Sequence, residues 1–226
     1  MRTRRRKRLL LDVDEVMADF LSPVFALVGA SRGRAIGPHD FEGWDFFATL
    51  SAEERRDVFA EVSRPGWCAS LAVKPGTEAA LLHLRSIVDV YAVTKPFPSP
   101  TWVHERDRWL VERLGFTSEQ IVHTGAKHIC RGDAFLDDNP DNVVRWNEEH
   151  PKAVAMLWHS PNTRLLGHDH LRVHGWDDVV LRVSALVSAE GRHDDRREDH
   201  EGHEGHEGRH GTLRRILRRI LGPGRA

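Results

Sequence analysis

The sequence is poor in cysteine and in long apolar runs. It has only two cysteines among 226 residues, Cys68 and Cys130, and their spacing favours neither a disulfide framework nor a zinc site. No run of about 18 apolar residues occurs, so we expect no membrane-spanning helix. The basic start is followed by an apolar segment that Asp12 and Asp14 interrupt at once, which is not the pattern of a signal peptide. We therefore expect a cytoplasmic protein.

The chain also has almost no net charge, because 33 lysines and arginines balance 34 aspartates and glutamates. The basic residues gather at the two ends, whereas the middle is acidic. With 40% hydrophobic residues, the chain can bury one sizeable core. We predict a basic tail (1–8), one catalytic domain (9–190), a disordered linker rich in histidine, glycine and glutamate (191–211), and a basic amphipathic helix (212–222).

Apolar runs alternate with helical patterns in the predicted domain. We expect strands near residues 8–13, 88–93, 120–124, 134–137 and 153–158, and helices near 77–86, 101–114, 140–149 and 177–188. This alternation predicts an α/β fold with a doubly wound, mostly parallel sheet. The first two strands are separated by an insertion far longer than the usual connection. Helical patterns near 16–29 and 52–62 predict that the insertion is a small helical cap, over about residues 16–75.

Three of the predicted strands end in residues that suit one cation and one phosphate. Asp12 and Asp14 follow the first strand, Thr94 ends the second, and Asp137 and Asp138 end the fourth. Ligands of open α/β sheets bind at the carboxyl ends of the strands. Carboxylates are the ligands that a hard cation such as Mg²⁺ prefers. We therefore expect Mg²⁺ and a phosphate group at this edge of the sheet.

These residue types can transfer a phosphoryl group. A carboxylate cannot approach an anionic phosphate ester until a cation and hydrogen-bond donors neutralise the phosphate oxygens. Thr94 and Lys127 can supply those donors, so that Asp12 can attack as a nucleophile and form an aspartyl-phosphate. Asp14 can protonate the leaving alkoxide and then activate water, if neighbouring carboxylates raise its pKa.

The same fragments, in the same order, resemble the four motifs of the haloacid dehalogenase superfamily of phosphatases. The motifs are DVDEVMADF at 12–20, Thr94, Lys127 and LDD at 136–138. Other segments are similar to the 5′(3′)-deoxyribonucleotidase family, namely KPG at 74–76, ERDRWLVERLG at 105–115, IVHTGAKH at 121–128 and HGWDDV at 174–179. The resemblance implies the superfamily's fold and a nucleoside monophosphate as substrate.

The resemblance also implies a role for each motif residue. Asp12 would be the nucleophile, Asp14 the acid/base, and Thr94 and Lys127 the phosphate ligands. Mg²⁺ would be held by Asp12, by the backbone carbonyl of Asp14, and by one or both of Asp137 and Asp138. Phe20, Trp44 and Trp67 would enclose the base, although aromatic residues of a cap more often belong to its core.

Two residues depart from the family pattern. Glu15 stands where these motifs usually have glycine, which adds an acid beside the expected pocket mouth. Lys95 follows Thr94 where a small residue is usual, and its charge can strengthen phosphate binding or contact a second anionic group.

Two alternatives stay open. The basic tails favour a phosphatase that acts on another phosphomonoester, such as a 3′-phosphate at a nucleic-acid end. They also suit a non-catalytic binding module, whose C-terminal basic helix would contact a membrane surface, a nucleic acid or a protein. Single histidines such as His123, His128 and His159 are assigned no role.

Overall fold

The computed structural model describes residues 5–160 and 171–198. The chain splits into two units, residues 1–189 and 190–226, and the fold below is that of the first unit. None of the helices in the described ranges is both long and apolar enough to cross a lipid bilayer.

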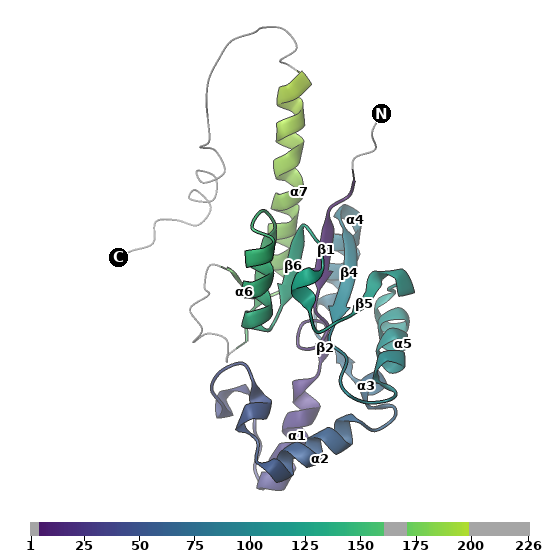
Figure 1. Cartoon of the computed structure of the whole chain (residues 1–226), viewed down its shortest axis with the longest axis vertical. Coiled ribbons are helices and arrows are strands. Elements are labelled where there is room, and N and C mark those ends of the chain that lie inside the picture. Colours follow the sequence, from purple (N-terminus) through teal and green to yellow (C-terminus); the bar gives the residue numbers. More distant parts are fainter. Residues whose placement is uncertain (1–4, 161–170, 199–226) are drawn as a thin grey trace, which may run out of the picture. The chain divides into compact units, whose positions relative to one another are not determined.

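A six-stranded parallel sheet forms the centre of the first unit (Figure 1). In spatial order its strands are β5 (Ile121–His123), β4 (Asp89–Thr94), β1 (Arg8–Leu11), β6 (Ala134–Asp137), β7 (Val154–Trp158) and β8 (Arg172–Val173). In β1, Leu9 pairs with Val90 on one side and with Ala134 on the other. Parallel sheets are covered on both faces, which explains why the central strands are almost continuously apolar.

Helices cover both faces of the sheet. They are α4 (Thr77–Ile87), α5 (Trp102–Leu114), α6 (Pro140–Glu149) and α7 (Trp176–Glu198). Leu9 and Leu11 of β1 belong to one buried cluster together with Trp109 of α5, whereas Leu10 belongs to a second cluster together with Trp146 of α6. Successive side chains of a strand point to opposite faces, and each buried leucine contributes about 1.5–3 kcal/mol. The predicted doubly wound α/β fold is confirmed.

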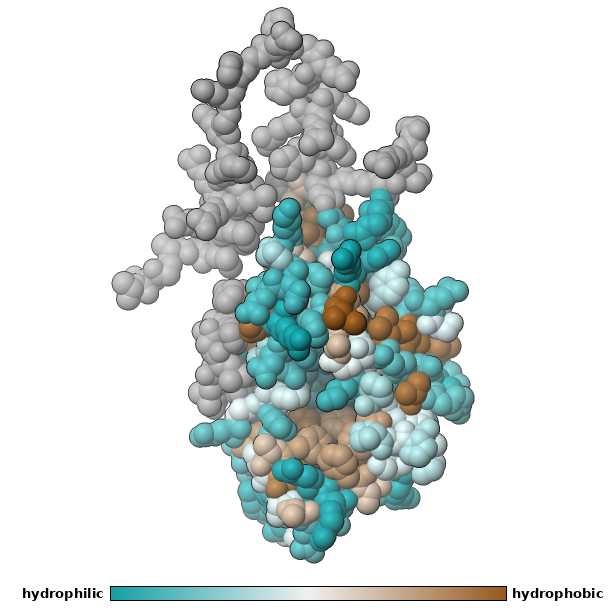
Figure 2. Space-filling view, in the orientation of Figure 1, coloured by the Kyte–Doolittle hydropathy of each residue, from teal (hydrophilic) through white to brown (hydrophobic). Residues whose placement is uncertain are grey.

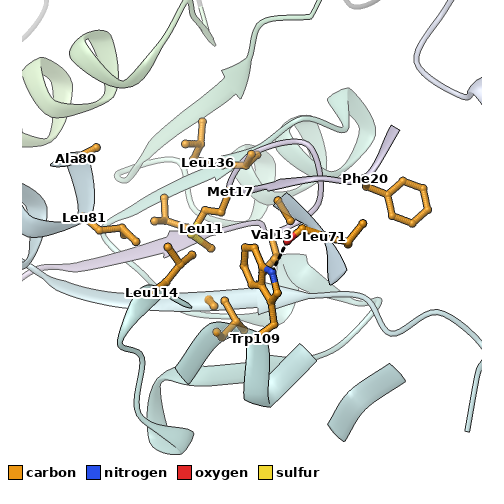
Figure 3. Packing of buried hydrophobic residues seen from close by; sticks show 14 of the residues in the cluster. Leu11, Val13, Met17, Phe20, Leu71, Ala80, Leu81, Trp109, Leu114 and Leu136 are labelled. Carbon is orange, nitrogen blue, oxygen red and sulfur yellow. Dashed lines mark hydrogen bonds between the residues drawn. The ribbon is translucent and has the colours of Figure 1, made fainter. Parts of the chain in front are cut away.

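The insertion between β1 and β4 is mostly helical. It contains β2 (Ala18–Asp19), α1 (Leu21–Arg32), the 3-10 turns η1 (Pro38–Asp40) and η2 (Phe46–Thr49), α2 (Ala52–Val62), α3 (Trp67–Ser70) and β3 (Ala72–Val73). In Figure 1, α1 and α2 lie beyond the carboxyl end of β1. The insertion returns to the core beside Trp109, whose Nε1 donates to the carbonyl of Leu71 at 2.7 Å (Figure 3).

Near the first strand the structure differs from the predicted elements. The sequence predicts a strand over 8–13 and a helix over 16–29, but β1 ends at Leu11 and α1 begins at Leu21. Between them the carbonyl of Val13 accepts from the N–H groups of Met17 and Ala18, which makes a tight turn. After this turn β2 pairs antiparallel with β3. The pairing is non-local, so the apolar pattern of residues 16–20 alone predicts a helix there.

The structure adds detail at the two predicted ends of the domain. Arg5 and Lys7 of the expected tail are paired with Asp133, and β1 already begins at Arg8. At the other end, α7 continues to Glu198, although a disordered linker is predicted from residue 191. A helix that is already nucleated propagates at little cost through charged residues such as arginine and glutamate. The rest of the predicted linker and the helix at 212–222 lie outside the described residues.

Two further connections complete the core. A 3-10 turn, η3 (Ser118–Gln120), leads into β5, and another, η4 (Lys127–Ile129), leads out of it. The second turn places Lys127 at the carboxyl edge of the sheet, beside the ends of β1 and β6.

Candidate active site

One buried lysine joins two buried carboxylates at the carboxyl edge of the sheet. Lys127 Nζ lies 2.5 Å from Asp12 Oδ1 and 2.8 Å from Asp137 Oδ2. Asp12, Asp137 and Lys127 are 6%, 0% and 4% exposed. The sequence predicted that these three residues share a site, and the structure brings them together.

Local backbone geometry holds both carboxylates. Oδ1 of Asp12 accepts from the N–H of Val13 at 2.7 Å. Oδ1 of Asp137 accepts from the N–H of Asn139 at 2.8 Å, and Asn142 Nδ2 donates to the same carboxylate. Asn139 also caps α6, because its side chain accepts from the N–H of Asp141, and Pro140 occupies the first helical position. The DDNPDN segment (137–142) therefore both begins helix α6 and holds the carboxylate of Asp137 in place.

Burial and crowding shift the pKa values of this cluster. Burial raises the pKa of Asp137 to about 6, with a further contribution from the charge of Asp12. Burial also raises the pKa of Asp12, although Lys127 opposes that shift. For Lys127 burial opposes the charged form, but the two carboxylates outweigh it and raise its pKa. The lysine is therefore charged, and it compensates for only one of the neighbouring carboxylates.

The acidic residues fit a hard cation. Oxygen atoms of Asp12, Asp137 and Asp138 lie within 4.8 Å of one another. Three carboxylates beside one lysine leave negative charge to balance, and this oxygen donor set suits Mg²⁺. Burial and the two neighbouring carboxylates raise the pKa of Asp138 well above its usual value. Asp14, whose backbone carbonyl the resemblance assigns to the same ion, contributes no side-chain oxygen to this group.

Asp14 is instead paired with a buried arginine. Arg106 Nη2 donates to Asp14 Oδ1 at 2.5 Å, and Arg106 is fully buried, whereas the Asp14 side chain is 27% exposed. The guanidinium carbon lies 5.1 Å from the ring centre of Trp102 and 5.6 Å from that of Trp109. Sequence reasoning missed Arg106, although its position on the buried face of α5, between two tryptophans, was a visible signal.

Thr94 is buried at the end of β4. Its Oγ1 atom has no hydrogen-bond partner among the described residues. A buried hydroxyl without a partner is costly, and it can donate to an oxygen of a bound ligand. Lys95 is exposed, and its methylene chain lies against Gly125.

Aromatic side chains of the insertion and of the core form one cluster. Phe20 lies 5.3 Å from Trp67 and 6.2 Å from Trp102, and the two tryptophan rings are stacked at 5.8 Å. Phe47, Phe59 and Phe97 continue the cluster, and Phe59 is 38% exposed. In the space-filling view, an apolar hollow lies on the part of the molecule that holds α1 and α2 (Figure 2).

Two predicted residues have other partners than expected. Trp44 lies outside the aromatic cluster, and its Nε1 donates to Asp138 Oδ2 at 2.9 Å, so the insertion reaches the acidic group. Glu15 does not present a free acid at a pocket mouth, because its carboxylate binds Lys74 and two backbone N–H groups.

The segment that carries Trp67 is held by Glu105 of α5, which accepts from the N–H groups of Gly66 and Ala69. Sequence reasoning also missed Glu105.

Solved structures with the same fold are hydrolases of the haloacid dehalogenase superfamily. A haloacid dehalogenase-like family protein from Streptococcus pneumoniae aligns with a TM-score of 0.52 and 11% identity, over 78% of this chain and 98% of that one. A subfamily IA hydrolase of the superfamily from Geobacter sulfurreducens aligns with a TM-score of 0.50 and 15% identity, over 79% and 96%. At such low identity these structures support the fold.

Sequence relatives point to one family within that superfamily. A 5′(3′)-deoxyribonucleotidase of Bacillus subtilis is 24% identical over 181 residues, which is 79% of this chain and 99% of that protein. A Staphylococcus epidermidis protein, described as a candidate enzyme of the same name, is 29% identical over 175 residues, or 77% and 94%. The family described as "5′ nucleotidase, deoxy (Pyrimidine), cytosolic type C" matches residues 6–188. This chain belongs to that family of nucleotidases and is a phosphoric monoester hydrolase.

Proposed function

We propose that this protein is a Mg²⁺-dependent 5′(3′)-deoxyribonucleotidase that hydrolyses nucleoside monophosphates through an aspartyl-phosphate on Asp12. The observation that carries the proposal is the buried arrangement of Asp12, Lys127 and Asp137 beside the unpartnered hydroxyl of Thr94. Membership of the nucleotidase family supports the same substrate class.

The cation would be held by Asp12, Asp137 and Asp138. When bound, it would neutralise phosphate oxygens and so lower the electrostatic cost of bringing an anionic ester to a carboxylate. Asn139 and Asn142 keep Asp137 oriented. Lys127 and Thr94 donate to the remaining phosphate oxygens, and their burial strengthens these interactions because water does not compete.

Asp12 then attacks the phosphorus atom. A bond forms from a carboxylate oxygen of Asp12 to phosphorus, and the bond to the ester oxygen breaks. Asp14 gives a proton to the departing alkoxide, and the nucleoside leaves. In the second half Asp14 takes a proton from water, which attacks phosphorus, and inorganic phosphate leaves Asp12 restored.

Arg106 orients Asp14 for both proton transfers. It donates to Oδ1, which leaves Oδ2 to exchange the proton with the alkoxide and with water. The tryptophans on either side of the guanidinium hold it in place through cation–π contacts. A carboxylate that has to serve twice in one turnover benefits from such a fixed orientation.

The aromatic cluster supplies the recognition of the base through its less buried rings, Trp67 and Phe59. Stacking of a base on an aromatic ring contributes about 1–3 kcal/mol and tolerates different bases. The basic residues at 5–7 precede β1, so they lie at the sheet edge opposite to Asp12. Arg5, Arg6 and Lys7 are already paired with Asp133 or Asp89. This placement favours a free nucleotide over a nucleic-acid end.

The test is release of inorganic phosphate with and without Mg²⁺. The panel holds 5′- and 3′-monophosphates of ribo- and deoxyribonucleosides, glycerol phosphate and an oligonucleotide with a 3′-phosphate. We expect Mg²⁺-dependent release from deoxyribonucleoside monophosphates, its loss in Asp12→Asn, and unchanged release in Asp141→Asn, an exposed aspartate of α6. Release from glycerol phosphate or the oligonucleotide alone would refute the nucleotidase proposal.

A further inference from the structure

Glu15 ties together the two segments that connect the insertion to the core. Its Oε1 accepts from the N–H groups of Phe20 and Leu21, at 3.0 and 2.8 Å. Its Oε2 lies 2.8 Å from Lys74 Nζ. The outgoing segment carries Phe20, and the returning segment carries Lys74, so one carboxylate joins the two. The backbone supports the same junction, since the N–H of Lys74 donates to the carbonyl of Met17 at 2.8 Å.

Glu15 has a backbone conformation that is unusual for a residue with a side chain. Glu15 has a φ of 60°, and it is the only described residue other than glycine with a positive φ. Side chains rarely adopt this left-handed conformation, whereas glycine adopts it freely, in keeping with the glycine that related motifs usually have here. A strained residue persists only where its surroundings over-determine it. The three bonds of the Glu15 carboxylate provide that compensation.

The junction lies between two parts of the proposed site. Glu15 directly follows Asp14, and its bonds end at the start of α1, where a carboxylate also interacts favourably with the helix dipole. Phe20, one of the residues that it holds, contacts the rings of Trp67 and Trp102. Glu15 therefore lies between Asp14 and the aromatic cluster, and it is bonded to the backbone that carries Phe20.

We propose that Glu15 is a positioning residue, which acts through Phe20 to set how tightly the enzyme holds the base of its substrate. The clamp consists of Glu15, Lys74 and the N–H groups of Phe20 and Leu21. This inference rests on the proposed nucleotidase function. It assigns to Glu15 no contact with the phosphate and no proton transfer.

Three variants separate the bonds of the clamp. Glu15→Gly removes the carboxylate and at the same time relieves the backbone conformation, so the variant is expected to fold. Glu15→Gln keeps an oxygen for the two N–H groups but loses the ion pair, as does Lys74→Met. Asp178→Ala is the matched control, because Asp178 accepts from the N–H of His174 at the start of α7, outside the insertion.

Two measurements are made on the full-length protein. The first is hydrogen exchange at the amides of Phe20 and Leu21, which reports the clamp whether or not the enzyme is active. The second compares kcat and KM for a deoxyribonucleoside monophosphate with those for glycerol phosphate, which has no base.

In Glu15→Gly we expect exchange at both amides to be at least about tenfold faster than in the wild type. We expect KM for the nucleotide to rise about tenfold, with kcat and the hydrolysis of glycerol phosphate changed by less than about twofold. Glu15→Gln should restore slow exchange and most of the affinity. Lys74→Met should fall between the wild type and Glu15→Gly, and Asp178→Ala should match the wild type.

Unchanged exchange in Glu15→Gly would overturn the clamp. Equal losses on both substrates through kcat would overturn the positioning role, because they would show that Glu15 acts on Asp14 instead. If the wild type hydrolyses no nucleoside monophosphate, the proposed function fails, while the exchange measurement still decides whether Glu15 holds the junction.

Discussion

The ion pair of Asp14 with Arg106 predicts that removing the proposed acid/base destabilises the fold as well as stopping turnover. In Asp14→Ala the fully buried guanidinium of Arg106 loses its carboxylate partner. Two further groups of Arg106, Nε and Nη1, are already buried without hydrogen bonds among the described residues. The substitution therefore leaves the buried cation of Arg106 without an ion-pair partner among the described residues.

The size of the effect follows from the geometry. Loss of one partner of a buried ion pair costs about 3–5 kcal/mol. The Asp14 side chain is 27% exposed, so water can reach the vacated position and reduce the cost. The contacts of the guanidinium with Trp102 and Trp109 remain in the variant. We expect a loss of about 2–3 kcal/mol, which corresponds to a fall in Tm of roughly 4–12 °C for a domain of this size.

Arg106→Met separates this explanation from a general effect of mutation. Methionine fills a similar space between the two tryptophans, and the partly exposed Asp14 can be hydrated. We expect a loss below about 1.5 kcal/mol. The double variant combines Asp14→Ala with Arg106→Met. It has no buried guanidinium that the loss of Asp14 could leave unpaired, so it should be more stable than Asp14→Ala alone.

The assay is urea unfolding followed by circular dichroism, without Mg²⁺, on the wild type, both single variants and the double variant. An Asp14→Ala protein within about 0.5 kcal/mol of the wild type would refute the argument. So would a double variant less stable than Asp14→Ala, because the buried charge would then not be the cause of the loss.

Three further predictions concern the cysteines, the cation site and the aromatic cluster. Burial raises the pKa of the Cys68 thiol to about 12 and also raises that of Cys130, so Ellman's reagent at pH 8 should leave Cys68 unmodified and react slowly with Cys130 until urea unfolds the protein. Rapid modification of both thiols in the folded protein would contradict this. Mg²⁺ should raise the Tm of the wild type by mass action, and less so that of Asp138→Asn, in differential scanning fluorimetry; equal shifts would exclude Asp138 from the ion's ligands. Phe59→Ala should raise KM for nucleotides several-fold and leave the hydrolysis of glycerol phosphate unchanged, because this exposed ring belongs to the aromatic cluster and lies on the insertion. A loss of activity on both substrates would show that Phe59 has a structural role.

The central sheet and its acidic edge could be predicted because local patterns encode them. Apolar runs such as Leu9 to Leu11 predict buried parallel strands, and Asp12, Thr94 and Asp137 follow directly in the chain. Strands of a parallel sheet end at one edge, so the sequence alone brings these residues to one place. Lys127 was found by its motif, and the structure explains its place through the 3-10 turn after β5.

What depended on non-local contacts was missed. The pairing of β2 with β3 joins residues far apart in the sequence, so the apolar residues 16–20 predicted a helix instead. The hydrogen bond from the Trp44 indole to Asp138 joins residues far apart in the chain, so no local pattern predicts it. The partners of Arg106 and Glu15 likewise come from other elements.

The sequence by itself thus determined the main strands and helices of the central sheet, the long insertion after its first strand, and the residues that meet at the carboxyl edge of the sheet. Hydrophobic periodicity and the ends of strands are local properties, and they are written in adjacent residues. Only the tertiary structure decided how Asp14 is held, what Glu15 binds and which aromatic rings meet. These features arise when the insertion packs against α5 and the strand ends, and no local pattern encodes such contacts.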